Sequence, residues 1–381
     1  MNCSPEGRSR RSFLIWRSSW DNMRDLDSTA TIERFDRSDM KSLLDSFSDQ
    51  ILEAKDIGHS CSIPRVYASG SSGIVFAGLG GSAIGADLIR SYLNEQSRIP
   101  IFVNRHYTLP GFVSSKTLVI VSSYSGNTEE TLSAFRQAVK KKARIIAVTS
   151  GGILADLAKK FKVPFVTIPG GLPPRCALAY SFFPALVLLE KLKVCGKQGR
   201  FVDETADLLR VLRNKKVGSA VPASRNIAKK IAMLLFGKFP VFYSGQDHFD
   251  AVATRWRGQL SENSKALSSS HVLPEMNHNE IVGWENPPRL LGKWTAVFLR
   301  DSGDHPRIKK RFEVSARILK DSGAATIELT SVGSSLLPRI FSLVHIGDYT
   351  SFYLALLYGQ DPTPVARIDY LKRELGKGSR Q

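Results

Sequence analysis

The sequence contains little cysteine and no long uninterrupted hydrophobic run. Its 381 residues include four cysteines, which form neither a C-x-x-C pair nor a zinc-ligand spacing. We expect free thiols in a reducing cytoplasm, although the sequence alone leaves a disulfide between distant positions open. No stretch reaches the ~18 consecutive apolar residues of a transmembrane helix, so we expect no membrane segment. The cysteines are Cys3, Cys61, Cys176 and Cys195.

A recognisable metal-binding pattern is also missing. The seven histidines are scattered along the chain, and neither H-x-x-x-H nor H-E-x-x-H occurs. This absence argues against a metal-dependent enzyme. We therefore expect neither a metal site nor a cofactor.

Acidic residues are outnumbered by basic ones. The chain has 53 Lys and Arg against 35 Asp and Glu, which gives a formal net charge of +18. Such an excess attracts polyanions, which include nucleic acids and small anionic substrates. The basic runs at 140–144, 213–216 and 307–311 lie in or near predicted helices, where solvated faces are the usual explanation. Nucleic acid is therefore not the partner we expect, and the origin of the charge stays open.

Short apolar strands alternate with helical patterns along the whole chain. This order predicts right-handed crossovers and parallel sheets, and the length suits two domains. We predict an α/β fold of two doubly wound parallel-sheet domains. The predicted division is a disordered or mis-started extension at 1–22, a first domain at 23–196, a linker at 197–224 and a second domain at 225–381. Strands are expected at 74–78, 99–103, 117–125, 144–150, 163–170, 239–246, 294–301 and 326–330, and the last helices near 334–344, 348–358 and 366–375.

The segment GLGGSAIG, residues 78–85, follows a predicted strand and precedes a helix. That context is typical of a dinucleotide-binding turn, G-x-G-x-x-G. The acidic residue that should bind a ribose hydroxyl roughly 20 residues later is absent, and Asn104 and Arg105 stand there instead. What remains is the exposed backbone of Gly80 and Gly81, whose N–H groups can approach an anion at a helix start.

The segment SSYSGNTEETL, residues 122–132, repeats this arrangement with more hydroxyl groups. The preceding strand brings Ser123 and Ser125 to the carboxyl edge of the sheet, and Asn127 or Thr128 can cap the next helix. Hydroxyls and free N–H groups at a helix N-terminus form a phosphate site that needs no lysine. An ordinary capped helix with serines in its turn is the alternative interpretation.

These two loops resemble the phosphosugar-binding loops of sugar isomerase (SIS) domains, which are flavodoxin-like. Four further segments extend the resemblance to the bifunctional phosphoglucose/phosphomannose isomerase family. The resemblance covers about residues 23 to 376, and the segment with Asn-His-Asn-Glu makes it more specific than the loops alone. The four segments are GLPPR at 171–175, SENSKAL at 261–267, PEMNHNEIVGWE at 274–285 and DPTPVARIDYLK at 361–372.

The resemblance implies an aldose–ketose isomerase that interconverts glucose 6-phosphate or mannose 6-phosphate with fructose 6-phosphate. It implies a cis-enediolate intermediate without metal, in which Glu262 is the base and Arg175 stabilises the enediolate. His278 would help to open the sugar ring, with assistance from Lys372. The residues implied in binding the 6-phosphate are Gly80, Gly81, Ser82, Ser123, Ser125 and Thr128.

The resemblance also implies a homodimer in which His278 comes from the partner subunit. Each site residue taken alone has an ordinary structural alternative, and a small shift in alignment would replace Lys372 with Arg367 or Arg373. A phosphosugar-binding regulator without catalytic activity is the second functional class. An isomerase that acts on a different sugar phosphate is the third.

Overall fold

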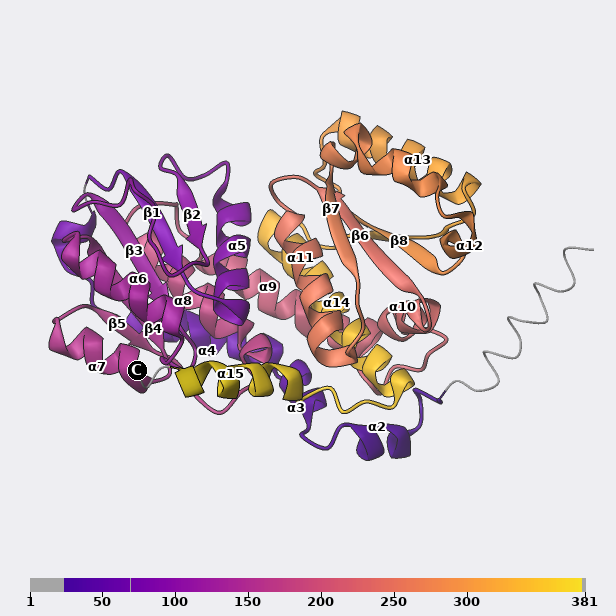
Figure 1. Cartoon of the computed structure of the whole chain (residues 1–381), viewed down its shortest axis with the longest axis horizontal. Coiled ribbons are helices and arrows are strands. Elements are labelled where there is room, and N and C mark those ends of the chain that lie inside the picture. The colour runs from indigo at the N-terminus through magenta and orange to yellow at the C-terminus, as the bar shows by residue number, and fades with distance from the viewer. Residues whose placement is uncertain (1–23, 69, 379–381) are drawn as a thin grey trace, which may run out of the picture.

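The computed structural model describes residues 24–68 and 70–378. It contains two parallel sheets, each with helices on its faces (Figure 1). The predicted α/β class with two parallel-sheet domains is confirmed. The predicted extension at 1–22 and Cys3 lie outside the described residues, while Cys61, Cys176 and Cys195 are free thiols.

The first sheet has five parallel strands in the order β2-β1-β3-β4-β5. Its strands β1 and β3 are buried at every position, which explains their continuous apolar sequences. The strands are β1 (Gly73–Ala77), β2 (Ile101–Asn104), β3 (Thr117–Ser122), β4 (Arg144–Thr149) and β5 (Phe165–Thr167). The helices of this part are α2 (Thr29–Phe35), α3 (Met40–Asp45), α4 (Phe47–Ser60), α5 (Gly80–Leu93), α6 (Glu129–Lys140), α7 (Gly152–Lys160), α8 (Leu178–Lys191) and α9 (Gly199–Leu212).

The second sheet has four parallel strands in the order β7-β6-β8-β9. The strands are β6 (Phe239–Gly245), β7 (Ser269–Leu273), β8 (Trp294–Arg300) and β9 (Ala325–Thr330). The helices are α10 (Ile227–Leu235), α11 (Asp250–Gln259), α12 (Pro288–Leu291), α13 (Pro306–Asp321), α14 (Leu336–Tyr358) and α15 (Ala366–Gly378).

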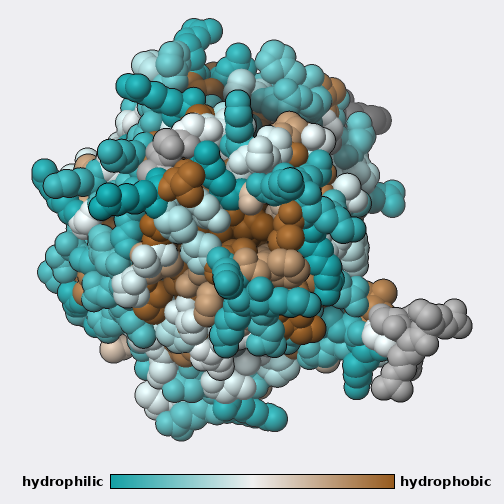
Figure 2. All heavy atoms as spheres, turned by 90° about the vertical axis from the view of Figure 1, so that its left-hand side faces the viewer, coloured by the Kyte–Doolittle hydropathy of each residue, from teal (hydrophilic) through white to brown (hydrophobic). Residues whose placement is uncertain are grey.

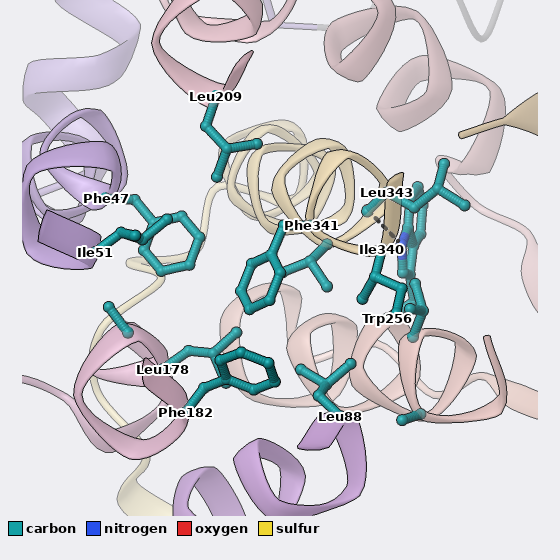
Figure 3. Close-up of a cluster of buried hydrophobic side chains, with 14 of the residues drawn as sticks. Phe47, Ile51, Leu88, Leu178, Phe182, Leu209, Trp256, Ile340, Phe341 and Leu343 are labelled. Atoms are coloured by element: carbon teal, nitrogen blue, oxygen red, sulfur yellow. Dashed lines mark hydrogen bonds between the residues drawn. The ribbon is translucent and has the colours of Figure 1, made fainter. Parts of the chain in front are cut away.

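Helix α14 joins the two halves through one hydrophobic core. Its Phe341 ring lies 4.9 Å from that of Phe182 on α8 and 6.2 Å from that of Phe47 on α4, measured between centroids. Figure 3 shows these rings pointing toward one another between helices of both halves. Among the described helices, α14 alone is long and apolar enough to cross a membrane, but its apolar stretch is completely buried and it serves as a core helix.

Three features differ from the sequence-based prediction. The two helices expected near 334–344 and 348–358 form the single helix α14, because Gly347 gives no break there and instead makes room for the indole of Trp256. Strand β7 was not predicted, since its sequence SSHVL begins with polar residues and it lies at a sheet edge. The residues expected as a linker, 197–224, contain α9 and a π-helical turn.

Charged and polar side chains cover most of the end of the molecule formed by the first sheet. Figure 2 shows this face as largely hydrophilic, with a hydrophobic area near its centre.

Two of the basic runs lie in helical segments elsewhere in the chain. The run at 307–311 lies on α13, and the run at 213–216 lies in the π-helical turn after α9. These placements agree with basic residues that occupy solvated helical faces.

Candidate active site

The two glycine- and serine-containing loops lie side by side at the carboxyl edge of the first sheet. Strands β1 and β3 are parallel neighbours, so the loops that follow them meet. A Cβ atom at Gly78 would lie 2.8 Å from the carbonyl oxygen of Ser122. The backbone of one loop therefore packs directly against that of the other.

The first loop enters α5 at Gly80, which has a left-handed φ of +52°. A Cβ atom at Gly81 would lie 2.5 Å from the carbonyl oxygen of Pro174, so only glycine fits there without movement. The N-cap residue Leu79 provides no side-chain acceptor for the first N–H groups of α5. Ser82 is buried in the first turn, and this helix start can receive an anion.

The second loop enters α6 with Thr128 at the N-cap position. The expected side-chain cap does not form, because the Thr128 hydroxyl lies 3.0 Å from the hydroxyl of Ser123. The Ser125 hydroxyl accepts from the N–H of Asn127 at 3.3 Å. The start of α6 thus combines hydroxyl groups with amide donors that have no side-chain cap, as an anion site requires.

Arg175 connects these loops to the second half of the chain. It lies in a short 3-10 turn (Pro174–Cys176) that packs on Gly81, and it is only 4% exposed. Its Nη1 lies 3.4 Å from Oε2 of Glu262, and its Nε donates to Oδ1 of Asn263 at 2.5 Å. Two residues that the family resemblance assigns to one site, 87 positions apart in the chain, are therefore neighbours in the structure.

Glu262 lies in a π-helical turn (Leu260–Ser264) that continues α11. Such turns are rare and occur often at functional sites. The neighbouring Asn263 is buried and donates to the Ser351 hydroxyl on α14 at 2.9 Å. The turn is thereby held in place, while the Glu262 carboxylate remains partly exposed beside Arg175.

The loop between α14 and α15 completes the surroundings of Arg175. The Nη2 group of Arg175 donates to the carbonyl oxygens of Pro362 at 2.8 Å and Thr363 at 2.7 Å. This loop leads directly into α15, which carries Lys372. Lys265 also reaches the loop, with its Nζ 3.0 Å from the Pro362 oxygen.

A buried ion pair that the sequence reasoning missed lies behind Arg175. Arg255 donates to both carboxylate oxygens of Asp348, at 3.0 and 2.7 Å, and each side chain is 4% exposed. Burial raises the pKa of Asp348, while Arg255 opposes that shift. Arg255 also donates to the Arg175 carbonyl oxygen at 3.0 Å. The sequence does contain one sign of this ion pair. Asp348 is a carboxylate within the otherwise uncharged apolar sequence of residues 340–358, and a buried carboxylate needs a positively charged partner.

His278 and Lys372 are not brought to this constellation within one chain. His278 is exposed in a 3-10 turn (Glu275–His278), and Lys372 is exposed on α15. Among the hydrogen bonds and ion pairs of residues 24–68 and 70–378, none joins either side chain to Glu262 or Arg175.

Cys176 follows Arg175 in the chain but is not a candidate nucleophile. Burial raises the pKa of the Cys176 thiol to about 12, so this neighbour of Arg175 stays protonated and is a poor nucleophile. Within the described part of the chain, no group of three His, Cys, Asp or Glu residues is arranged to hold a metal ion.

Comparisons with known proteins show the family of this chain. Residues 224–375 match the family model of the bacterial phospho-glucose isomerase C-terminal SIS domain, and residues 69–165 match that of the SIS domain. The bifunctional phosphoglucose/phosphomannose isomerase of Caldicellulosiruptor bescii is 45% identical over 329 residues, which cover 86% of this chain and 96% of that protein. This chain belongs to the bifunctional phosphoglucose/phosphomannose isomerase family.

Other members of the bifunctional phosphoglucose/phosphomannose isomerase family are similar over most of their length. That of Aquifex aeolicus is 39% identical over 80% of this chain and 91% of its own. A solved glucose-6-phosphate isomerase like protein from Thermus thermophilus shares the fold, with a TM-score of 0.59 and 21% identity over 90% of this chain and 99% of that one. The chain is thus an enzyme of the isomerase class built from SIS-type domains.

Proposed function

We propose that this enzyme interconverts glucose 6-phosphate and mannose 6-phosphate with fructose 6-phosphate, through a cis-enediolate and without a metal. The observation that carries the proposal is the contact between Arg175 and Glu262, 3.4 Å apart, beside two adjacent loops built for an anion. A carboxylate base next to a fixed positive charge is what proton transfer at a carbon beside a carbonyl group requires.

The 6-phosphate of the substrate would bind at the starts of α5 and α6. The N–H groups of Gly80 and Gly81 and the hydroxyl of Ser82 supply the first half of that site. Ser123, Ser125 and Thr128 supply the second half. The hydroxyls of Ser123 and Thr128 are already 3.0 Å apart, so a phosphate oxygen can accept from both with little reorganisation.

The chemical step would begin with the open-chain sugar. His278 and Lys372 open the ring by moving a proton between the ring oxygen and the C1 hydroxyl. The Glu262 carboxylate removes the C2 proton, which leaves a cis-enediolate whose negative oxygen faces the Arg175 guanidinium. A proton passes from the C2 oxygen to the C1 oxygen, the same carboxyl group returns the abstracted proton to C1, and the ketose is formed.

Use of both epimers requires room for rotation about the C2–C3 bond, because their C2 protons point in opposite directions. Thr363 is the residue that we propose shapes this space. Its carbonyl oxygen accepts from Arg175 at 2.7 Å, and its buried hydroxyl has no hydrogen-bond partner among the described residues. A rotation of the Thr363 side chain that exposes this hydroxyl would let it bind a rotated sugar hydroxyl.

The active site would be completed by a second copy of the chain, with His278 supplied by the partner. The exposure of His278 supports this arrangement. Helix α15 also supports a second copy of the chain, because it exposes apolar side chains on one face. Ile368, Leu371 and Leu375 follow helical spacing there and are 40%, 57% and 56% exposed. We propose that the enzyme is a cytoplasmic homodimer.

The test is the formation of fructose 6-phosphate from glucose 6-phosphate and from mannose 6-phosphate, each with a chelator present. Glu262→Gln should abolish both activities, whereas the matched surface variant Glu313→Gln should retain them. Activity on only one of the two aldose phosphates would contradict the proposed dual specificity. Binding of phosphosugar without turnover by the parent enzyme would favour a regulator, and activity lost to the chelator would contradict the metal-free mechanism.

A further inference from the structure

The ammonium group of Lys265 lies where the Glu262 turn meets the loop before α15. Lys265 follows this turn with a left-handed φ of 56°. Its Nζ is 2.9 Å from the carbonyl oxygen of Glu262 and 3.2 Å from that of Asn263. It is also 2.9 Å from the carbonyl oxygen of Asp361 and 3.0 Å from that of Pro362. An ammonium group has three donors, so these four acceptors use all of them.

The loop that Lys265 binds is the one that Arg175 binds from the first half of the chain. The Pro362 carbonyl oxygen accepts from both cations, and the Thr363 oxygen accepts from Arg175. Without Lys265, no ammonium group would join the carbonyl oxygens of this loop to those of the Glu262 turn. The loop would then be held by Arg175, the same group that the reaction needs to face the substrate.

We propose that Lys265 is a positioning residue for the isomerisation. It ties the Glu262 turn to residues 361–362, and so holds the Glu262 carboxylate, the Arg175 guanidinium and the loop that leads to Lys372 in one arrangement. Lys265 acts through these groups, because its donors are directed at main-chain carbonyl oxygens. This inference rests on the proposed function.

The charge of Lys265 makes the role testable by pH. The charged groups that face it are Arg175 from the first half, Asp361 on the bound loop and Glu262 on its own turn. Burial, and then the charge of Arg175, lower the pKa of Lys265 to about 8, while the two carboxylates oppose this shift. A neutral amine has only two donors and forms weaker hydrogen bonds than an ammonium group. The tie should therefore weaken above about pH 8.

The experiment measures kcat and KM for fructose 6-phosphate formation between pH 6.5 and 10. In the parent enzyme, kcat should fall several-fold with a midpoint near pH 8. Lys265→Arg should keep at least about a third of the parent kcat at pH 7 and shift that midpoint above pH 10, because a guanidinium stays charged. Lys265→Met should lower kcat at least tenfold at pH 7, with a smaller change in KM and no midpoint near pH 8. Lys310→Met, on the exposed face of α13, is the matched control.

Two outcomes would overturn the role of Lys265. One is a Lys265→Met enzyme that keeps the parent kcat and the midpoint near pH 8. The other is a Lys265→Arg enzyme that keeps the midpoint near pH 8, which would assign the titration to a different group. Thermal unfolding of each variant separates a loss of positioning from a loss of folding.

A second measurement tests the Lys265 contact independently of isomerase activity. Amide hydrogen exchange over residues 360–376 should be faster in Lys265→Met than in the parent and in Lys310→Met, because the loop has lost its tie. A parent enzyme with no isomerase activity at any pH would overturn the proposed function alone. Unchanged exchange over this segment would then overturn the tie itself.

Discussion

The Arg255 guanidinium and the Asp348 carboxylate form a bidentate pair, and both side chains are almost completely buried beneath the Arg175 backbone. Removing one partner leaves the other charge without compensation. We expect Asp348→Leu to destabilise the fold by about 3–5 kcal/mol. The measurement is denaturant unfolding, with Glu313→Leu at an exposed ion pair as the control that should change stability by less than about 1 kcal/mol.

The double variant Arg255→Met with Asp348→Leu separates stability from function. Much of the lost stability should return, because no unpaired charge remains. The activity should stay reduced, because the Arg175 carbonyl oxygen has lost its donor. Full recovery of kcat in the double variant would show that the pair does not position Arg175.

Ser123→Ala tests the second anion loop. The substitution removes one hydroxyl of the Ser123–Thr128 pair and leaves the buried backbone unchanged. A hydrogen bond to a charged group is worth about 1.5–3 kcal/mol, so kcat/KM for sugar phosphates should fall about 10- to 100-fold. Ser60→Ala, at an exposed helix end, is the control. An unchanged kcat/KM would show that the Ser123 hydroxyl does not bind the phosphate.

Gly81→Ala tests the contact between the first loop and the turn that carries Arg175. The new methyl group would meet the Pro174 carbonyl oxygen at 2.5 Å, so one of the two segments must move. Overpacking of this kind costs about 1–3 kcal/mol, and we expect it to appear mainly as a loss of kcat. Gly111→Ala, where a Cβ atom meets nothing within 4 Å, should behave like the parent.

His345 predicts a dependence of stability on acid. It is buried between the rings of Phe47 and Tyr349, neither ring nitrogen has a partner among the described residues, and burial lowers its pKa to about 3. The unfolded chain binds this proton near pH 6.5, so stability should fall as the pH drops below that value. From pH 7 to pH 5 the expected loss is about 2 kcal/mol.

The matched measurement compares His345→Leu with the parent by denaturant unfolding at pH 7 and pH 5. At pH 7 the variant should be at least as stable, because two unpaired buried nitrogens are removed. Its stability should also change less between the two pH values. The exposed-site variant His59→Gln should keep the full dependence of the parent. A parent enzyme equally stable at both values would contradict the assigned state of His345.

Local signals explain what could be predicted from the sequence. The glycines and hydroxyls after β1 and β3 lie within short segments, and their order along the chain fixes where the sheet brings them. The partners of Arg175 could not be found in this way. Its acceptors lie 87 to 188 positions away, and Pro362 and Thr363 contribute carbonyl oxygens, which carry no signature in the sequence of side chains.

Residues that support the site through distant backbone contacts are equally hard to predict from the sequence. Lys265 read alone is an ordinary surface lysine, and its role becomes visible only when the loop after α14 is folded onto it. Strand β7 was missed because neighbours, and not its own polar start, decide that it pairs with β6. All of the residue roles taken from the family resemblance remain predictions. These are the roles of Glu262, Arg175, His278 and Lys372 and of the two phosphate loops.

The placement of Arg175 has a consequence for how this enzyme can evolve. The arginine is encoded in the first half of the chain, whereas its acceptors at Asn263, Pro362 and Thr363 are encoded in the second. Two halves of similar architecture suggest interchangeable modules. A half transplanted into another chain would leave a guanidinium buried with no acceptor, or acceptors with no donor. Gene fusion and shuffling can therefore preserve this contact only when the incoming half supplies the matching donor or acceptors.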